Sequence, residues 1–360
     1  MNIGIITPAP PGSRLGNRVT AIRWARILRS LGHRVTIAEA CGDKRFDLLV
    51  ALHARRSFDS VNRFHREHPD PPIVVALTGT DLYRDLRVRP RAKRSLEIAT
   101  RIVVLQKEAL EDLRRSWRTK ARVIHQSVSV HHPVRGSGTR PQALGEHPQA
   151  SKMGSFRGGK TLGSPKSFDV CVVGHLRPVK DPFRAAMAVR RLPISSRIRV
   201  VHAGGALTAG QKARAIREMK TNTRYKWLGE VSRPAVERLM SRSRLFVISS
   251  VMEGGANALG EAIVSGLPVL ASRIPGTVGI LGERYPGYFE VGDTVQLARL
   301  MLRAESDPRF LADLARHCGS LISLFDPASE LHAWSELLDE IFHERRRFDT
   351  KHHGGRGWRR

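Results

Sequence analysis

The residues best suited to chemistry lie in one loop that follows an apolar run and precedes a helical pattern. Gly254 and Gly255 let the backbone approach a ligand closely. The helix expected to begin at Asn257 offers unpaired N–H groups and its positive dipole end to an anion such as a pyrophosphate. Glu253 and Glu261, with seven residues between them, place two carboxylates within reach of the hydroxyls of one ligand. Alone, Glu261 is an ordinary exposed helix residue; together with the glycines it predicts a ligand site.

This loop, with the run Ser265–Ser272 behind its helix, resembles the donor loop of the GT-B family 4 glycosyltransferases. The resemblance implies that Glu253 meets the hydroxyls of the transferred sugar and that Glu261 holds the ribose hydroxyls of a UDP-sugar. It also implies that loop amides meet the sugar and the diphosphate; these belong to Gly254, Gly255, Ala256 and Asn257.

The segment Gly174–Asp181 resembles the phosphate-binding turn of the same family, and Lys180 matches the lysine of that turn. His175 stands where the family usually has arginine, so one positive charge is missing unless Arg177 reaches inward or His175 is protonated. The segment Lys226–Val231 resembles the strand end that accepts the nucleotide base, which adds Leu228 and Val231 to the implied donor site.

The catalytic set implied by the resemblance is Glu253, Lys180 and His175. A lysine and a helix dipole can stabilise the leaving UDP by themselves. We therefore predict a metal-independent transferase with no metal site and no cofactor, in which the UDP-sugar is a cosubstrate.

Apolar runs and amphipathic segments alternate along both halves of the chain, as in parallel sheets covered by helices. Between residues 131 and 168 the periodicity disappears and linker composition takes over. We expect an α/β GT-B fold with two doubly wound, Rossmann-like domains facing a cleft. The predicted parts are an acceptor domain (1–130), a basic flexible linker (131–168), a nucleotide-sugar domain with closing helices (169–344) and a disordered basic tail (345–360). The predicted strands are 2–7, 34–38, 48–52, 73–77, 101–105, 122–124, 169–173, 199–203, 226–228, 245–249, 268–271 and 288–291.

Polar side chains follow three predicted strands of the first half, where ligands bind in such sheets. They are Arg55, Arg56 and Ser57 after the third strand, Thr78, Thr80 and Asp81 after the fourth, and Gln126 and Ser127 after the sixth. Guanidinium and hydroxyl donors suit a small, multiply anionic acceptor. Each residue alone can equally well cap a helix or form a salt bridge. A lipid or polysaccharide acceptor would be expected to come with an exposed apolar or aromatic surface, which the sequence does not clearly show.

A closer resemblance covers nearly the whole chain from Asn2 to Phe325 and points to the selenosugar synthases of selenoneine biosynthesis. It lies in Gly16–Asn17, Arg23–Arg26, Leu52–Ser57, Leu77–Asp85 and Met252–Ala256. It implies transfer of a sugar, N-acetylglucosamine in the first instance, from a UDP-sugar to selenophosphate, which gives a 1-selenosugar. The acceptor residues so implied are Gly16, Asn17, His53, Arg55, Arg56, Thr78, Thr80, Asp81 and Gln126. Selenium is already anionic near neutral pH, so this acceptor needs no general base.

Length and composition limit the classes of protein to which the chain can belong. The chain has 360 residues, 41% hydrophobic and 26% charged, which suits a two-domain globular protein. No apolar run is long enough to cross a bilayer and no signal peptide is evident, so we expect a cytoplasmic protein. The three cysteines are far apart and encode neither a disulfide framework nor a zinc site. His65 and His68 lack partners at ligand spacing.

The net charge of +28 leaves a different class of function open. Residues 1–130 carry 25 basic and 12 acidic side chains, so most of the excess outside the linker and tail belongs to the first half. A strongly basic chain suits a polyanion or an anionic membrane surface, but no nucleic-acid-binding motif is present. The alternatives are a family 4 transferase with a carbohydrate or lipid acceptor, or a basic nucleic-acid or membrane-surface binding protein. The sequence gives no oligomeric state.

Overall fold

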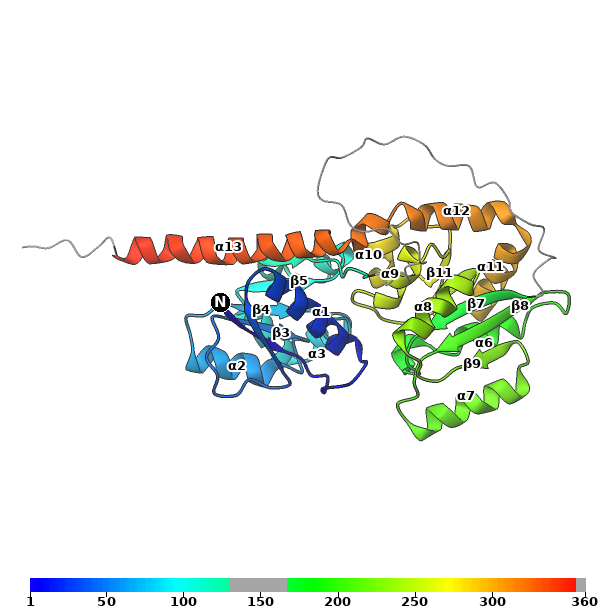
Figure 1. Cartoon of the computed structure of the whole chain (residues 1–360), viewed down its shortest axis with the longest axis horizontal. Helices are drawn as coiled ribbons and strands as arrows, with labels where there is room; N and C mark the ends of the chain where they lie inside the picture. Colours follow the sequence, from blue (N-terminus) through cyan, green and yellow to red (C-terminus); the bar gives the residue numbers. More distant parts are fainter. Residues whose placement is uncertain (130–166, 354–360) are drawn as a thin grey trace, which may run out of the picture.

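The computed structural model describes residues 1–129 and 167–353, which form two six-stranded parallel sheets. The sheet of the first domain has the order β2-β1-β3-β4-β5-β6, and that of the second has the order β12-β11-β10-β7-β8-β9. Helices cover the sheets, and the two domains lie side by side (Figure 1). The predicted fold of two doubly wound domains is confirmed.

The strands of the first domain are apolar runs rich in Ile, Val and Leu, as expected of strands buried on both faces. They are β1 (Asn2–Ile6), β2 (Arg34–Ala38), β3 (Leu48–Leu52), β4 (Ile73–Ala76), β5 (Arg101–Val104) and β6 (Ala121–Val123). The helices are α1 (Gly16–Ser30), α2 (Phe58–Glu67), a π-helical turn η1 (Asp81–Asp85), α3 (Leu86–Val88), α4 (Pro90–Ile98), η2 (Lys107–Leu110) and α5 (Arg115–Arg118).

The second domain repeats this plan. Its strands are β7 (Phe168–Val173), β8 (Ile198–Ala203), β9 (Tyr225–Trp227), β10 (Leu245–Ile248), β11 (Val269–Ser272) and β12 (Tyr288–Phe289). Its helices are η3 (Pro178–Lys180), α6 (Arg184–Val189), α7 (Ala209–Thr221), α8 (Arg233–Arg242), α9 (Asn257–Val264), α10 (Pro275–Leu281), α11 (Thr294–Ser306), α12 (Pro308–Gly319) and η4 (Ile322–Phe325). Each predicted strand of both domains is present within two residues of its predicted bounds.

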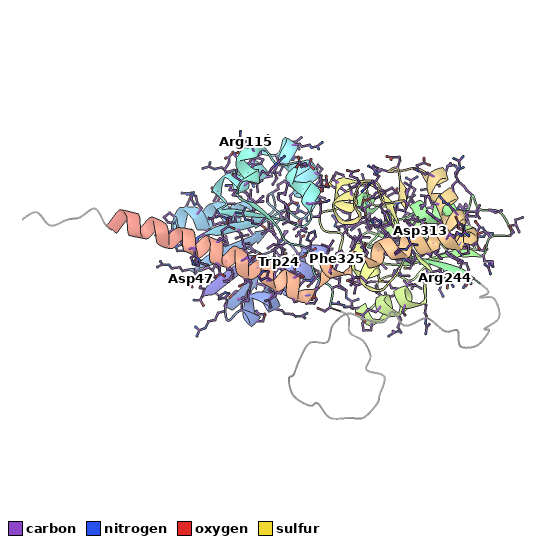
Figure 2. The ribbon with its side chains drawn as sticks, turned by 90° about the horizontal axis from the view of Figure 1, so that it is seen from above. Trp24, Asp47, Arg115, Arg244, Asp313 and Phe325 are labelled. Carbon is purple, nitrogen blue, oxygen red and sulfur yellow. The ribbon has the colours of Figure 1, made fainter. Side chains whose placement is uncertain are left out.

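The last helix, α13 (Pro327–His353), corrects two predictions about the C-terminal part of the chain. The sequence assigned it to the second domain, but its apolar stripe completes the core of the first, where Trp334 packs edge-on against Trp24 with ring centroids 4.9 Å apart. Figure 2 shows α13 running along the first domain past Trp24. The helix also continues to His353, through part of the predicted disordered tail, because no glycine or proline interrupts it before Gly354.

The predicted linker lies almost wholly outside the described residues, as do tail residues 354–360. At its end the prediction was wrong by one residue, since Phe168 is buried and begins β7. Among the described residues, no helix combines the length and apolar composition needed to span a membrane.

The domains contact each other where their strands end. A Cβ atom at Gly254 would lie 2.5 Å from the carbonyl carbon and oxygen of Thr78, and one at Gly255 would lie 2.9 Å from Oε1 of Gln126. Real Cβ atoms do not approach so closely, so only glycine fits at both positions. The loop after β10 therefore lies directly against the loops after β4 and β6.

Candidate active site between the two domains

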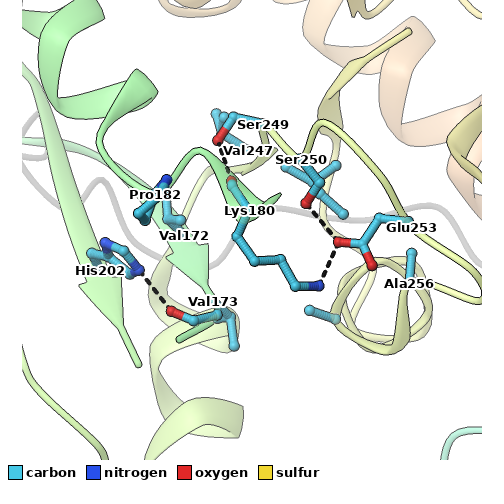
Figure 3. A pocket seen from close by; sticks show the side chains of 13 residues that line it. Val172, Val173, Lys180, Pro182, His202, Val247, Ser249, Ser250, Glu253 and Ala256 are labelled. Carbon is cyan, nitrogen blue, oxygen red and sulfur yellow. Dashed lines mark hydrogen bonds and ion pairs between the residues drawn. The ribbon is translucent and has the colours of Figure 1, made fainter. Parts of the chain in front are cut away.

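The loop after β10 brings a carboxylate against an ammonium group from the turn after β7, at a small cavity (Figure 3). Glu253 is only 7% exposed, and its Oε1 accepts a 2.5 Å hydrogen bond from Ser250 Oγ and an ion pair from Lys180 Nζ. Ser272 Oγ in turn donates to the Ser250 carbonyl at 2.5 Å. Two of the three implied catalytic residues are thus in direct contact, and the serines serve as supports for the loop.

The buried side chain of His202 contacts the start of the predicted phosphate-binding turn. His202 Nε2 lies 2.9 Å from the Gly174 carbonyl oxygen, and His202 Nδ1 lies 3.0 Å from the Tyr225 hydroxyl. Burial lowers the pKa of His202 to about 4, so the ring is neutral at pH 7 and Nε2 donates its proton to the carbonyl. At the other end of the turn Asp181 has φ 42°, a left-handed conformation that costs energy for a non-glycine residue.

His175 contacts backbone groups of both domains. Its Nδ1 accepts the Gly205 N–H at 3.1 Å, and its Nε2 faces the Arg14 carbonyl oxygen at 3.5 Å. Both ring nitrogens thus face backbone groups. Arg14 comes from the first domain and donates to the Val231 carbonyl at 2.7 Å, at the predicted base-binding strand end.

The start of α9 matches the predicted anion-binding end of a helix. Its N-cap residue, Ala256, has φ 41° and offers no side-chain cap, so the first amides of the helix have no side-chain acceptor there. Asn257 Oδ1 accepts from both Nη atoms of Arg23, each at 3.2 Å. Burial raises the pKa of Glu261, an effect that the nearby cations Arg233 and Arg23 oppose. Leu228, the remaining base-side residue, is 37% exposed.

The acceptor side has a buried carboxylate that organises its loops. Asp81 is 0% exposed and accepts backbone N–H groups from Thr78 at 2.9 Å, Gly79 at 2.9 Å and Ala54 at 3.0 Å. These bonds tie the loop after β3 to the loop after β4. Asp81 thus organises these loops through its backbone contacts, and its contact with the acceptor stays a prediction.

The side chain of His53 also makes its contacts within these two loops. It is 2% exposed, has φ 74°, and places Nε2 3.1 Å from Thr80 Oγ1. Its Nδ1 accepts the Arg56 N–H at 3.4 Å. Burial lowers the pKa of His53, and the opposing influence of Asp81 does not cancel this.

The guanidinium groups beside these loops outnumber the carboxylates. Asp85 accepts hydrogen bonds from Arg55 Nε at 2.6 Å and Arg84 Nε at 3.1 Å, and these bonds hold its pKa below the ordinary value despite its burial. Burial lowers the pKa of Arg56, and the cations Arg55 and Arg177 lower it further. Neither Arg56 nor Arg177 forms an ion pair with any described residue. The charges of Arg55, Arg84 and Arg177 therefore all act on Arg56, as does that of Asp85, and we call these four arginines the arginine cluster.

Sequence reasoning missed two members of the arginine cluster. Arg84 lies within the quoted run Leu77–Asp85, next to the aspartate that it binds, and this adjacency was a usable signal. Arg177 was assigned to the donor site, yet its charge acts on Arg56 of the first domain. No spacing in the sequence reveals that proximity, because it arises between the two domains.

The other predicted acceptor residues lie on the same side of the cleft. Gln126 is buried and donates to Thr20 Oγ1 at 2.6 Å, beside Gly255. Gly16 and Asn17 begin α1, which has no capping side chain. The structure thus places Gln126 beside the donor loop, and Gly16 and Asn17 at the start of a helix.

Comparisons with known proteins agree with this fold. Residues 160–320 match the family model of Glycosyl transferases group 1. HepE of Anabaena, solved with UDP and glucose, has a TM-score of 0.68 at 15% identity, covering 94% of this chain and 100% of its own. Sucrose-phosphate synthase of Thermosynechococcus elongatus has a TM-score of 0.73 at 13% identity, covering 95% and 99%. No curated protein matches this chain with significant sequence similarity. The family model thus matches a little less than half of the chain, in its second domain, and the whole chain has the GT-B fold.

Proposed function

We propose that this chain, whose second domain matches the Glycosyl transferases group 1 model, is a glycosyltransferase that transfers a sugar from a UDP-sugar to selenophosphate. N-acetylglucosamine is the sugar that we favour, and a 1-selenosugar for selenoneine biosynthesis is the product. The observation that carries the acceptor half of the proposal is the arginine cluster, whose four guanidiniums outnumber the neighbouring carboxylates Asp81 and Asp85.

The donor half rests on the loop after β10 and the turn after β7. The free amides at the start of α9 suit the diphosphate, and Glu261 suits the ribose hydroxyls. In the ligand-free arrangement Lys180 is paired with Glu253. Binding of a UDP-sugar would exchange this pair for two new contacts, with Lys180 on the diphosphate and Glu253 on the sugar hydroxyls. The solved relative HepE was crystallised with UDP and glucose, which supports a nucleotide-sugar in a site of this fold.

The acceptor half rests on charge. Unpaired guanidiniums that are partly withdrawn from water are stabilised by an anion, and a phosphate-type group accepts several charge-assisted hydrogen bonds at once. Asp81 and His53 keep the loops in place, while Arg56 and Arg177 remain available. A neutral sugar or lipid acceptor would gain nothing from this excess of positive charge.

The reaction needs no proton acceptor. A selenium lone pair forms the bond to the anomeric carbon as the bond from that carbon to the diphosphate oxygen breaks, and its electron pair leaves with UDP. Lys180 and the α9 amides stabilise the charge that develops on UDP. Water then cleaves the selenium–phosphorus bond, which releases phosphate and the selenosugar.

Mass spectrometry of the products from UDP-N-acetylglucosamine, with and without selenophosphate, tests the proposal. We expect a selenosugar and a matching amount of UDP only when selenophosphate is present, with inorganic phosphate as the control that retains the charge but lacks selenium. Equal UDP release without selenophosphate, or sugar found on a carbohydrate or lipid acceptor, would refute the selenophosphate assignment and support the general transferase. Tight, salt-sensitive nucleic-acid binding without turnover would refute both.

A further inference from the structure

Arg23 is a first-domain residue that reaches the donor side of the cleft. It lies on α1, and both of its Nη atoms donate to Asn257 Oδ1 at 3.2 Å. Asn257 begins α9, and Glu261 lies four residues further on, so both side chains share one face of that helix. The first domain therefore supports the helix that carries the implied ribose-binding carboxylate.

The anchor behind Arg23 is a buried glutamate at the start of α13. Glu330 is 2% exposed and accepts from Trp24 Nε1 at 2.8 Å, from the Ser127 N–H at 2.8 Å and from Ser127 Oγ at 2.5 Å. Three bonds from two segments of the first domain fix this carboxylate. Its charge acts on Arg23 together with that of Glu261.

The charges facing Glu261 come from two elements. Arg23 on α1 and Arg233 on α8 favour its ionised form, and Glu237 on α8 opposes it. Glu261 accepts no hydrogen bond from any residue that the structure describes, so its oxygens are free for a ligand. Glu330 and Glu261 both act on Arg23, and Arg23 and Arg233 both act on Glu261, so each of these two central charges is flanked by charges of opposite sign.

We infer that Arg23 is a positioning residue for the nucleotide-sugar: it completes the donor site from the opposite domain by orienting Asn257 and placing a cation beside the helix face that carries Glu261. Ribose hydroxyls donate more strongly to a carboxylate than to a neutral carboxylic acid. This inference rests on the donor half of the proposed function and is independent of the acceptor.

The test is UDP binding by calorimetry between pH 5.5 and 8.5 for wild type, Arg23→Gln, Arg23→Lys and Arg26→Gln. Arg26 is an exposed arginine on the same helix and serves as the matched control. We expect Arg23→Gln to weaken UDP binding about tenfold at pH 7.5, a typical loss for one charged contact. The loss should grow as the pH falls, because removing the cation raises the pKa of Glu261 and depletes its ionised form. Arg23→Lys should restore part of the affinity, and Arg26→Gln should bind as wild type does.

A steady-state measurement separates positioning from chemistry. Arg23→Gln should raise KM for the UDP-sugar and leave kcat within about twofold, since ribose contacts act in the ground and transition states alike. Adding Glu261→Gln to Arg23→Gln should cause little further loss, because the two residues act as one unit.

Three results would overturn the inference: wild-type affinity in both Arg23 variants, a loss that does not change with pH, or fully additive losses in the double variant. Each of them leaves the proposed function intact if the wild type binds UDP. A wild-type protein that binds no UDP would instead refute the donor half of the proposed function, and this inference with it. Arg23→Lys keeps the test decisive if Arg23→Gln does not fold.

Discussion

The two sides of the cleft balance their charges differently. On the donor side the Lys180 ammonium and the Glu253 carboxylate neutralise each other, and Ser250 adds a hydrogen bond to the same oxygen. On the acceptor side Arg55 and Arg84 share the carboxylate of Asp85, while further cations of the arginine cluster have no counter-charge of their own.

This difference bears on what each side binds. A pair that is already neutral is suited to a ligand that presents both kinds of group, hydroxyls for the carboxylate and a diphosphate for the ammonium. A group of cations with excess charge is suited to a ligand that brings only negative charge. The contrast therefore predicts exchange of partners on the donor side and simple charge compensation on the acceptor side.

The largest effect should come from removing the donor-side cation. Lys180→Ala removes a group that meets the charge developing on UDP, and the loss of one such contact lowers kcat by about 10²- to 10³-fold. Lys212→Ala, an exposed lysine on α7, is the matched control and should leave kcat unchanged. Steady-state kinetics with both substrates saturating decide the matter, and a wild-type kcat in Lys180→Ala would show that the donor assignment is wrong.

A comparable loss should follow from separating the two sides. In Gly254→Ala the new Cβ would meet Thr78 backbone atoms at 2.5 Å, and backbone cannot move aside as a flexible side chain can. We expect kcat/KM to fall about 10²-fold, the typical result of an ångström-scale misplacement. Gly210→Ala has no atom within 4 Å of its Cβ position and should retain activity. Wild-type activity in Gly254→Ala would show that catalysis does not depend on the close approach of Gly254 to the Thr78 backbone.

On the acceptor side the expected effect is on affinity. Arg56→Ala should raise KM for selenophosphate by about 10- to 100-fold, equivalent to roughly 1.5 to 3 kcal/mol for a charge-assisted contact. KM for the UDP-sugar should stay unchanged, and this difference is the control within the same experiment. An unchanged KM for selenophosphate would show that Arg56 of the arginine cluster does not bind the acceptor.

The two sides also differ in how far the sequence could define them. The donor loop is continuous in sequence, so its glycines, helix start and carboxylates could be predicted together. The role of Asp81 could not be predicted, because three backbone N–H groups from two loops converge on it only in the folded chain. The proximity of Arg177 to Arg56 likewise depends on how the domains meet.

The fold also divides into parts that a local sequence pattern predicts and parts that depend on packing in the folded chain. Buried strands are apolar runs and were predicted nearly to the residue, whereas the short helix α10 (Pro275–Leu281) was not predicted. The periodicity of α13 predicted a helix but not its place, since an apolar stripe does not say which sheet it covers. The contact between Trp334 and Trp24 decides that.

A stability comparison within the arginine cluster tests the charge argument without substrates. Arg55→Ala leaves the buried Asp85 with one hydrogen-bond donor fewer, and we expect the free energy of unfolding to fall by about 1.5 kcal/mol. Arg56→Ala removes a cation that has no carboxylate of its own, and stability in anion-free buffer should change by less than about 0.5 kcal/mol. Denaturant unfolding of both variants checks this, and equal losses would contradict the view that Arg56 is electrostatically unsatisfied.

The smallest effect on turnover should come from His53. Since its φ is 74°, the suitable substitution is His53→Asn, because asparagine tolerates the left-handed region better than most residues and keeps a hydrogen-bonding group. Burial lowers the pKa of His53 below 6.5. Between that value and its lower folded pKa the unfolded chain binds more protons, so the histidine reduces stability as the pH falls through this window. The asparagine variant should lack that part of the pH dependence.

The kinetic prediction for the same variant follows from the acceptor chemistry. An anionic selenium needs no base, so His53→Asn should keep kcat within about threefold of wild type at pH 7.5, whereas loss of a true general base costs about 10²-fold or more. The measurement is kcat with selenophosphate saturating, with circular dichroism to confirm the fold. Near-complete loss of kcat in a folded His53→Asn protein, together with a wild-type selenophosphate KM in Arg56→Ala, would mean that the acceptor is a hydroxyl activated by His53. In that case the excess charge of the arginine cluster would have to serve something other than the acceptor.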